Sequence, residues 1–502
     1  MSKLFEAMER ATNKALTENG ALSNRSTLNN VLDLFAIGGA VRGHSYDEVQ
    51  DLFAKAFAED QLLALKTIFY LRDIRGGQGE RKTFRRAMRY LAQYYPNVIR
   101  MNLDNFAHYG RWDDLLQLDQ TQVWDEVVLV IKAQLDTDLY NWSQREGAEV
   151  SLLAKWLPSI NTSSRSSKAL AKKLCKELEY SYKDYRKMLS TLRSHIKIVE
   201  KQMCGREFGQ IKYETVPSQA MLRYNSAFKN RDGKRYSRYL EDVKSGKKEI
   251  KAGTLYPAQI VGKIRNCQRM DGTGLENVDQ LWNALPNYLE DNPHKGLCVV
   301  DVSSSMTCSY NNPSGVAPMD VAISLGLYIA ERNKCPVFGN KFITFSGTPS
   351  LQRVEGEDII GKVHHLEEAD WCMNTDLQAT FDLILDEAVT HRLTNNDLPD
   401  TLYIISDMEF DEATGCRHGV STNLEVIQSK YEKAGYIMPK IVFWNVDAKN
   451  QQVPVTIDDR GVCMVSGYSP AILQSLLRGD IESPMQVLLD TVSVERYDRV
   501  VV

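Results

Sequence analysis

The side chains best suited to chemistry in this sequence are five oxygen donors in its C-terminal part. They are Asp301, Ser303, Ser305, Thr375 and Asp407. The first three follow the apolar run 297–300, a pattern that predicts a buried strand ending in a polar loop. Hard oxygen donors at this spacing suit Mg²⁺ or Mn²⁺. The other two lie where a predicted helix begins and where the predicted strand 402–405 ends, so we expect one divalent-cation site.

The charge of this predicted site favours ligand capture over catalysis. A cation that needs about six oxygen ligands would use these donors, directly or through water, and keep a position open. Because only Asp301 and Asp407 are anionic, the metal stays electrophilic toward an acidic side chain of a partner protein. A hydrolase would also need a general base beside the bound water, for which His364, His365 and Asp370 are candidates. We therefore expect a docking site and no enzymatic activity.

Alternating strands and helices are expected around these donors. Strands are predicted at 297–300, 341–345, 351–354, 401–405, 441–446 and 461–467, and helices at 319–330, 376–391, 423–434, 470–477 and 484–492. Such alternation is typical of a doubly wound α/β domain, whose mostly parallel sheet carries helices on both faces. Ligands bind such sheets at the carboxyl ends of the strands, which is where Asp301 and Asp407 are expected.

The order of these donors supports a resemblance to a known family. Asp301-x-Ser303-x-Ser305, followed by Thr375 and Asp407, resembles the metal-ion-dependent adhesion site (MIDAS) of von Willebrand factor A domains. The resemblance implies a Rossmann-like von Willebrand factor A domain at 296–502. It also implies that the cation, Mg²⁺ first and Mn²⁺ second, binds an acidic residue of a protein partner.

Residues 1–290 are predicted to be helical throughout. Apolar residues recur at helical spacing in 60–71, 80–95 and 123–140, and short polar turns separate these runs. Helix pairs joined by short turns must bury their apolar faces on neighbouring pairs, which favours an α-solenoid of HEAT-like repeats. The glycine-rich turn 76–79 lacks the Gly-Lys-Ser/Thr ending of a phosphate-binding loop and lies between helices. We therefore interpret it as a helix-to-helix turn.

Three segments of this helical part carry a second resemblance. Residues 70–81 (YLRDIRGGQGER) and 109–115 (YGRWDDL) look like the helical TROVE module of Ro-type ribonucleoproteins, which precedes a von Willebrand A domain in those proteins. Residues 154–164 (AKWLPSINTSS) resemble a Ro-related family of unassigned function that is found partly in viruses. The resemblance implies a TROVE-like domain at 1–290 that binds RNA.

Basic residues are concentrated between Ala154 and Arg265. This segment holds 26 Lys and Arg against 10 Asp and Glu, a balance of +16, whereas the rest of the chain has a balance of −20. So long an excess favours a nucleic-acid surface whose binding weakens steeply with salt, because neutralised phosphates release counterions. The predicted contacts are Lys168, Lys172, Lys173, Lys176, Arg186, Lys187, Arg193 and Lys197. Charge does not distinguish RNA from DNA; the choice of structured or single-stranded RNA comes from the Ro-type resemblance.

Composition is that of an ordinary soluble protein. Hydrophobic residues make up 43% and charged residues 25% of the chain, and no stretch has the roughly 18 uninterrupted apolar residues of a membrane-spanning helix. The nine cysteines are scattered without a Cys-x-x-Cys pair, which favours reduced thiols. We expect a cytoplasmic protein with no membrane partner.

Three functions of different classes fit these observations. The first is a non-catalytic, Ro-like RNA-binding scaffold whose metal site docks an acidic protein partner. The second is a von Willebrand A adaptor for a protein machine such as an AAA+ ATPase, without nucleic acid. The third is a metal-dependent hydrolase. Copurifying nucleic acid separates the first two, and cleavage of RNA or phosphoesters with Mg²⁺ or Mn²⁺ identifies the third.

Overall fold

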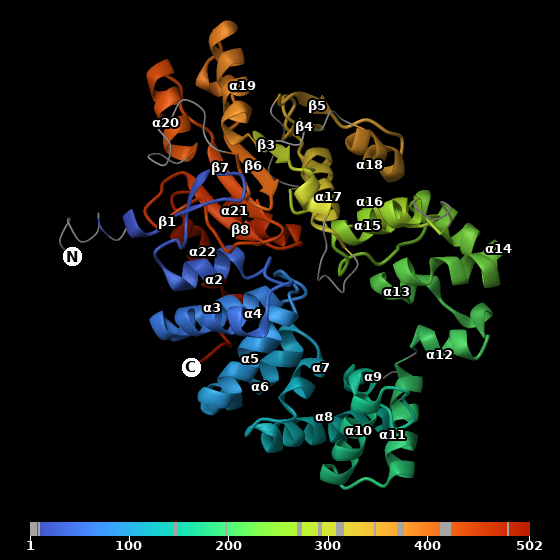
Figure 1. Ribbon diagram of the computed structural model, residues 1–502. Coiled ribbons are helices and arrows are strands. Elements are labelled where there is room, and N and C mark those ends of the chain that lie inside the picture. The colour runs from blue at the N-terminus through green and yellow to red at the C-terminus, as the bar shows by residue number, and fades with distance from the viewer. Residues whose placement is uncertain are drawn as a thin grey trace.

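The computed structural model describes residues 8, 11–144, 149–196, 198–268, 274–289, 294–307, 316–345, 348–368, 376–411, 423–478 and 481–502. Within these ranges the chain forms a helical array, residues 30–283, and a sheet with its covering helices, residues 296–492, which pack against each other (Figure 1). None of the helices in these ranges is both long enough and apolar enough to cross a membrane.

The helical array consists of short amphipathic helices, as the periodicity predicts. They are α2 (Asn30–Ile37), α3 (Tyr46–Glu59), α4 (Gln61–Arg72), α5 (Lys82–Tyr94), α6 (Pro96–Tyr109), α7 (Trp112–Leu115), α8 (Trp124–Gln144), α9 (Leu153–Trp156), α10 (Arg165–Glu177), α11 (Tyr182–His195), α12 (Val199–Cys204), α13 (Ser218–Arg223), α14 (Asn225–Lys244), α15 (Pro257–Gln268) and α16 (Val278–Asn283). In α5, Phe84, Met88 and Leu91 recur at helical spacing and are buried. Ser45 and Ser164 begin α3 and α10 by accepting hydrogen bonds from backbone amides of the first turn.

The prediction that residues 1–290 are helical throughout is wrong at the N-terminus. β1 (Lys14–Leu16) and β2 (Leu22–Asn24) form an antiparallel hairpin. The hairpin is held by contacts that sequence periodicity does not reveal, because its partners lie about 400 residues away. Asn24 exchanges backbone hydrogen bonds with Val453, and the Thr17 hydroxyl donates to the carbonyl of Phe410. Three-residue strands are also too short to show a clear alternation of apolar and polar residues.

The C-terminal part forms the mostly parallel sheet that its alternating pattern predicts. Its strands are β3 (Gly296–Val300), β4 (Lys341–Thr344), β5 (Leu351–Arg353), β6 (Thr401–Ser406), β7 (Lys440–Asn445) and β8 (Val462–Ser466), in the order β5-β4-β3-β6-β7-β8. Its helices are α17 (Pro318–Arg332), α18 (Ile359–Glu368), α19 (Leu377–Thr390), α20 (Asn423–Ala434), α21 (Leu473–Arg478) and α22 (Pro484–Val492). The edge strand β5 is antiparallel to β4, as the predicted hairpin requires, and the other pairs are parallel.

Strand order brings the two predicted acidic donors together. The chain passes from β3 to β4 and β5 on one side, then returns to place β6 on the other side of β3. The pairing of Val300 with Ile405 ends both strands at the same level. Asp301 and Asp407 therefore leave the sheet next to each other, at the point where the strand order reverses and ligands of such sheets bind.

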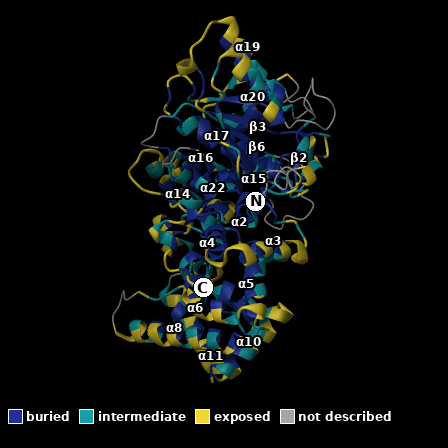
Figure 2. Ribbon diagram, turned by 90° about the vertical axis from the view of Figure 1, so that its left-hand side faces the viewer, coloured by how far each residue is buried: buried dark blue, intermediate teal, exposed yellow. Residues whose placement is uncertain are grey.

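Both ends of the helical array contact the sheet part, so the helices form an arc that returns to it (Figure 1). At one end, α2 packs against β8, and Gly39 donates its amide hydrogen to the Ser466 hydroxyl. At the other end, α15 packs along α17, where Arg265 forms ion pairs with Asp320 and Glu367. Figure 2 shows that buried residues concentrate where the two parts meet, whereas α8, α10 and α11 carry many exposed positions.

The glycine-rich turn between α4 and α5 lies at this junction and is a helix-to-helix turn, as predicted. Asp73 accepts hydrogen bonds from Arg496, with 2.8 Å between Arg496 Nη2 and Asp73 Oδ1, and from the Tyr497 hydroxyl at 3.1 Å. Gln78 donates to the Tyr70 hydroxyl and accepts from the backbone amide of Ser469. These hydrogen bonds join the turn to Ser469, Arg496 and Tyr497, so they hold the C-terminal segment against the helical array.

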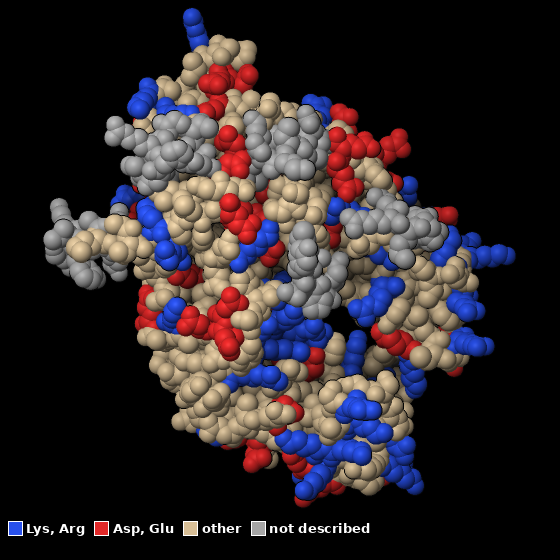
Figure 3. Space-filling model, viewed as in Figure 1, with Lys and Arg blue, Asp and Glu red and all other residues tan. Residues whose placement is uncertain are grey.

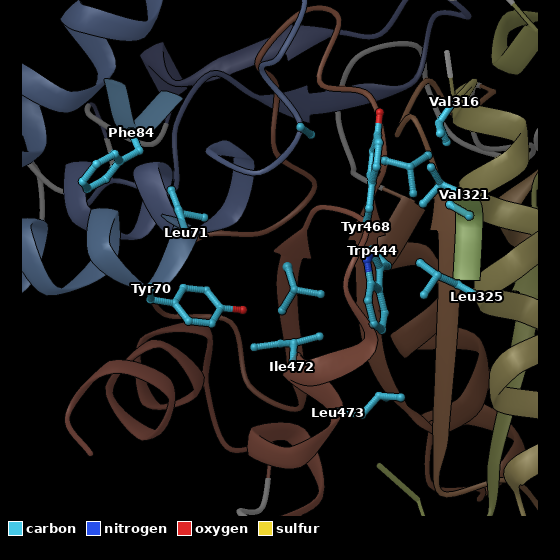
Figure 4. Close-up of a cluster of buried hydrophobic side chains, with 14 of the residues drawn as sticks. Tyr70, Leu71, Phe84, Val316, Val321, Leu325, Trp444, Tyr468, Ile472 and Leu473 are labelled. Atoms are coloured by element: carbon cyan, nitrogen blue, oxygen red, sulfur yellow. The ribbon is translucent and has the colours of Figure 1, made fainter. Parts of the chain in front are cut away.

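Apolar side chains from both parts share the buried region behind this turn. Figure 4 shows Tyr70 and Leu71 on the helical side and Ile472, Leu473 and Trp444 on the sheet side. Tyr70 points toward Ile472, and its ring packs edge-on to Tyr497 with 6.2 Å between ring centroids. The two parts therefore bury a common core, and they are expected to unfold together.

Removing the Asp73 carboxylate should weaken this junction. Burial favours a higher pKa for Asp73, but hydrogen bonds from Arg496 and backbone amides outweigh burial and hold the pKa below its ordinary value. Asp73→Asn leaves Arg496 without its anionic partner and should lower the free energy of unfolding by about 3 kcal/mol. Urea unfolding measures this change. The control is Asp498→Asn, which removes the exposed pair with Lys66 and should cost less than about 1 kcal/mol; equal effects would contradict the assignment.

Candidate functional site

The carboxyl ends of β3 and β6 carry a continuous chain of oxygen atoms. Asp301 is fully buried; its Oδ1 accepts from the Ser303 amide at 2.9 Å, and its Oδ2 accepts from the Ser406 hydroxyl at 2.6 Å. The Ser303 and Ser305 hydroxyls lie 2.9 Å apart, and the Ser305 hydroxyl donates to Asp407 Oδ2 at 2.8 Å. The structure thus brings together four of the five predicted donors. Thr375 lies outside the described residues.

A lysine supplies positive charge to this cluster. Lys449 follows β7, and its Nζ lies 2.7 Å from Asp407 Oδ2 and 3.2 Å from the carbonyl oxygen of Ser305. The Lys449 ammonium group therefore contacts an oxygen of Asp407 and an oxygen of Ser305, which are also joined by the hydrogen bond from the Ser305 hydroxyl. The helical array contacts the loop that carries it, because the carbonyl oxygen of Ala448 accepts a hydrogen bond from the His44 ring.

Carboxylates outnumber this lysine. Burial, together with the neighbouring Asp407 carboxylate, raises the pKa of Asp301 to about 6. Burial also raises the pKa of Asp447 to about 6, and it raises the pKa of Glu409 above its ordinary value. The pKa of Lys449 is raised, because attraction to Asp407 outweighs the opposing effect of burial. The site is therefore short of positive charge when it holds no other cation.

The chemical types of the donor atoms suit a hard divalent cation. Its atoms are carboxylate and hydroxyl oxygens, which Mg²⁺ and Mn²⁺ prefer over nitrogen or sulfur. Among the described residues, no group of three or more His, Cys, Asp or Glu side chains is arranged to hold a metal ion. A cation here would consequently depend on the serine hydroxyls beside Asp301 and Asp407, with water completing its coordination.

The histidines considered as general bases lie on α18. His365 Nε2 lies 2.9 Å from the carbonyl oxygen of Arg353, at the β5 edge of the sheet, and the residue is partly exposed. This hydrogen bond gives His365 a structural partner on the backbone. Asp370 lies outside the described residues.

The predicted nucleic-acid residues separate into two groups. Lys168, Lys172 and Lys176 on α10, and Arg186 and Lys187 on α11, are exposed, and none forms an ion pair with an acidic residue in the described part of the chain. Figure 3 shows Lys and Arg gathered over the region of α10 to α14 and around the hollow between α7 and α12.

The remaining predicted contacts bind the protein itself or are not described. Lys173 donates to the carbonyl oxygen of Asp119, and its ammonium lies 4.5 Å from the ring centroid of Trp124. Arg193 donates to the carbonyl oxygens of Ala154 and Leu157, each at 2.8 Å. Lys197 lies outside the described residues.

The predicted ligand set did not include Lys449. It also did not include Ser406, although the sequence places Ser406 directly before Asp407 at the end of the same strand. Lys449 gave no local signal, since it follows Asp407 by 42 residues and reaches the site only through the order of β6 and β7.

The motif residues of the helical part form a second buried charge cluster. Arg72 and Asp114 are buried and lie 2.7 Å apart between Arg72 Nη2 and Asp114 Oδ2. Arg85 pairs with both Asp114 and Asp113, and Arg111 pairs with Asp113. These contacts hold α4, α5 and α7 together, so the structure gives both motifs a packing role.

Comparison with known proteins places the chain in a family. Residues 17–134 and 119–293 match the family described as "Domain of unknown function (DUF2828)", and together they span more than half of the chain. The chain belongs to this DUF2828 family. Residues 295–498 also match the "Domain of unknown function (DUF7788)".

A curated relative and a solved structure illustrate what this DUF2828 protein is similar to. "Uncharacterized protein L728" of Acanthamoeba polyphaga mimivirus is 29% identical over 514 residues, covering 95% of this chain and 87% of the relative. The crystal structure of the Deinococcus radiodurans RO (RSR) protein is 15% identical and covers 92% of this chain and 93% of that one. Its TM-score is 0.37, which is too low to establish a common fold.

The buried carboxylate Asp301 should make the stability of the metal-free DUF2828 protein depend on pH. Its pKa rises from 3.8 to about 6 on folding, so the folded protein holds this proton more tightly than the unfolded chain. The stabilisation by protonation is complete below pH 3.8 and is lost as the pH rises through 6. Asp301→Asn should therefore reduce the loss of stability between pH 5 and pH 7.5.

Urea unfolding in a metal chelator across this pH range measures the effect. The Asn variant removes the charge and keeps the shape, and it should be the more stable protein at pH 7.5, by up to about 3 kcal/mol. Asp382→Asn, at a partly exposed pair with Lys430, is the control and should keep the wild-type pH dependence. Parallel curves for wild type and Asp301→Asn would contradict the burial of an ionised Asp301.

Proposed function

We propose that this protein is a non-catalytic RNA-binding scaffold of the Ro-like type. The observation that carries the proposal is the exposed basic face of α10 and α11, where Lys168, Lys172, Lys176, Arg186 and Lys187 have no acidic partner among the described residues. Elsewhere in the helical array, arginines such as Arg72 and Arg85 are neutralised by aspartates. Cations left without partners on one surface are available to phosphates.

RNA is the nucleic acid we propose because of the TROVE-like motifs at 70–81 and 109–115. The two motifs pack against each other through Arg72 and Asp114, so they would act by shaping the array and not by touching RNA. Contact with RNA would then come from the basic face, which recognises the phosphate backbone of structured or single-stranded RNA and carries little base specificity.

The sheet part would contribute a protein-docking site of the von Willebrand A type. We propose that Asp301, Ser303, Ser305 and Asp407, with Thr375, hold Mg²⁺ or Mn²⁺ and leave a position for a carboxylate of a partner protein. A bound cation would supply the Lewis acidity that attracts this carboxylate. Docking is favoured over hydrolysis because His365 is held at the carbonyl oxygen of Arg353.

Reversing charges on the basic face should weaken RNA binding strongly. The variant Lys168→Glu/Lys172→Glu/Lys176→Glu should lose at least 10-fold in affinity for RNA at 100 mM salt. The slope of log affinity against log salt should also become shallower, by about 0.7 to 0.9 for each lost phosphate contact. Fluorescence anisotropy with labelled RNA measures both quantities.

A charge-matched control tests whether position or total charge matters. Arg392→Glu/Lys433→Glu/Arg460→Glu makes the same charge change at exposed positions of the sheet part and should bind RNA almost as wild type does. Equal losses in the two variants would show a dependence on net charge only. Unchanged binding in the α10 variant would rule out this face.

Removing Lys449 should strengthen binding of a divalent cation at the proposed metal site. The Lys449 ammonium contacts Asp407 Oδ2 and the carbonyl oxygen of Ser305, so it competes for the same oxygens and repels a second cation. Lys449→Met should bind Mn²⁺ at least 10-fold more tightly than wild type, as measured by electron paramagnetic resonance of free Mn²⁺. Asp301→Asn should abolish binding in either background, and an unchanged affinity in Lys449→Met would show that the lysine does not compete.

A further inference from the structure

Residues 154–164, the segment that resembles the Ro-related family, form one wall of a groove. The groove has a volume of about 890 Å³ and is bounded by the end of α7, by this segment, by α11 and by α12. Residues 155–162 line it without interruption. Grooves of this size lie within the range of sites that bind small molecules or parts of larger ones.

The backbone of this wall is held in place by side chains of α11. The Arg193 guanidinium donates to the carbonyl oxygens of Ala154 and Leu157 and to the Ser159 hydroxyl, each at 2.8 Å. The Tyr185 hydroxyl donates to the carbonyl oxygen of Pro158 at 3.0 Å. Four hydrogen bonds from α11 therefore fix the chain from Ala154 to Ser159, which lowers the entropic cost of ordering this wall when a ligand binds.

The side chains that this wall presents include hydrogen-bonding groups without a partner. The amide of Asn161 and the hydroxyl of Thr162 form no hydrogen bond with any residue that the structure describes, although their neighbours on the wall are bonded. Leu170 and Leu189 provide an apolar floor, and Arg186 provides a cation without an ionic partner among the described residues. Amide and hydroxyl groups beside an apolar floor and a cation match the edge, the face and the phosphate of a nucleotide.

A planar group also lines the same groove. Trp156 lines the groove, and the Arg111 guanidinium lies 3.9 Å from its ring centroid. Arg111 is itself held by Asp113, so the stacked pair is fixed in position. This arrangement connects the buried charge cluster of α4, α5 and α7 with the groove.

We propose that this groove binds unpaired nucleotides of RNA, with Asn161 and Thr162 contacting the bases and Arg186 contacting phosphate. The proposal rests on the RNA-binding function proposed above and gives that function a second component. The basic face of α10 attracts any RNA backbone, whereas the groove admits only nucleotides that are free of pairing, because the stacked and paired bases of a duplex cannot be splayed out into such a cleft.

Salt dependence separates the groove from the basic face. The variant Asn161→Ala/Thr162→Ala removes no charge, so its affinity for a labelled single-stranded 10-nucleotide RNA should fall at least 5-fold with an unchanged slope of log affinity against log salt. Its affinity for a fully paired RNA duplex should stay within 2-fold of wild type. Both positions lie at the surface, and thermal unfolding should match that of wild type.

Ser163→Ala/Ser166→Ala is the matched control, because it alters the same stretch of chain at exposed positions that do not line the groove. This control should bind the single-stranded RNA as wild type does, and ultraviolet crosslinking should attach that RNA to the peptide that contains residues 155–162. Wild-type affinity of Asn161→Ala/Thr162→Ala for the single strand, while wild type itself binds, would overturn the groove and leave the scaffold proposal standing. Failure of the wild-type protein to bind either RNA would overturn both.

Discussion

The contact between Asp73 and the C-terminal pair Arg496 and Tyr497 is the constraint on which the rest of the structure depends. It joins residues more than 400 positions apart, and it lies beside the apolar core that both parts of the molecule share. With the turn between α4 and α5 held here, and α15 held by the ion pair of Arg265 with Asp320 of α17, the helices between them follow an arc. The positions of the basic face, the groove and the metal site relative to one another follow from this closure.

Sequence patterns predicted the elements whose causes are local. α20 and α22 have the predicted boundaries because apolar periodicity and, for α22, a proline at the start act within the helix itself. Asp301 and Asp407 were predicted to meet because parallel strands share a carboxyl edge, and the register of β3 and β6 confirms that inference.

Features produced by distant contacts could not be predicted in the same way. The β1–β2 hairpin depends on Val453 and Phe410, and Lys449 reaches Asp407 only because β7 lies beside β6. Arg193 illustrates a different limit, because composition counts its charge as available to RNA, whereas folding directs its guanidinium to the 154–159 segment. The net charge of a segment therefore overstates the number of cations available to RNA wherever basic side chains form hydrogen bonds within the protein.

The two parts of the molecule offer surfaces of opposite character. Uncompensated cations lie on α10 and α11, whereas buried carboxylates that lack sufficient positive charge lie at the end of β3 and β6. A polyanion and an acidic protein held through a cation can therefore bind the same chain without competing for one surface. This separation is the physical basis for proposing a scaffold and not a single-ligand protein.

The central claim, that the chain binds RNA through its exposed basic face, is tested most directly by an equilibrium titration of the purified wild-type protein with labelled RNA at several salt concentrations. The account predicts binding at 50 mM salt, with log affinity falling linearly as log salt rises and a slope that corresponds to several phosphate contacts. No binding at 50 mM salt, or an affinity that does not change with salt, would contradict it.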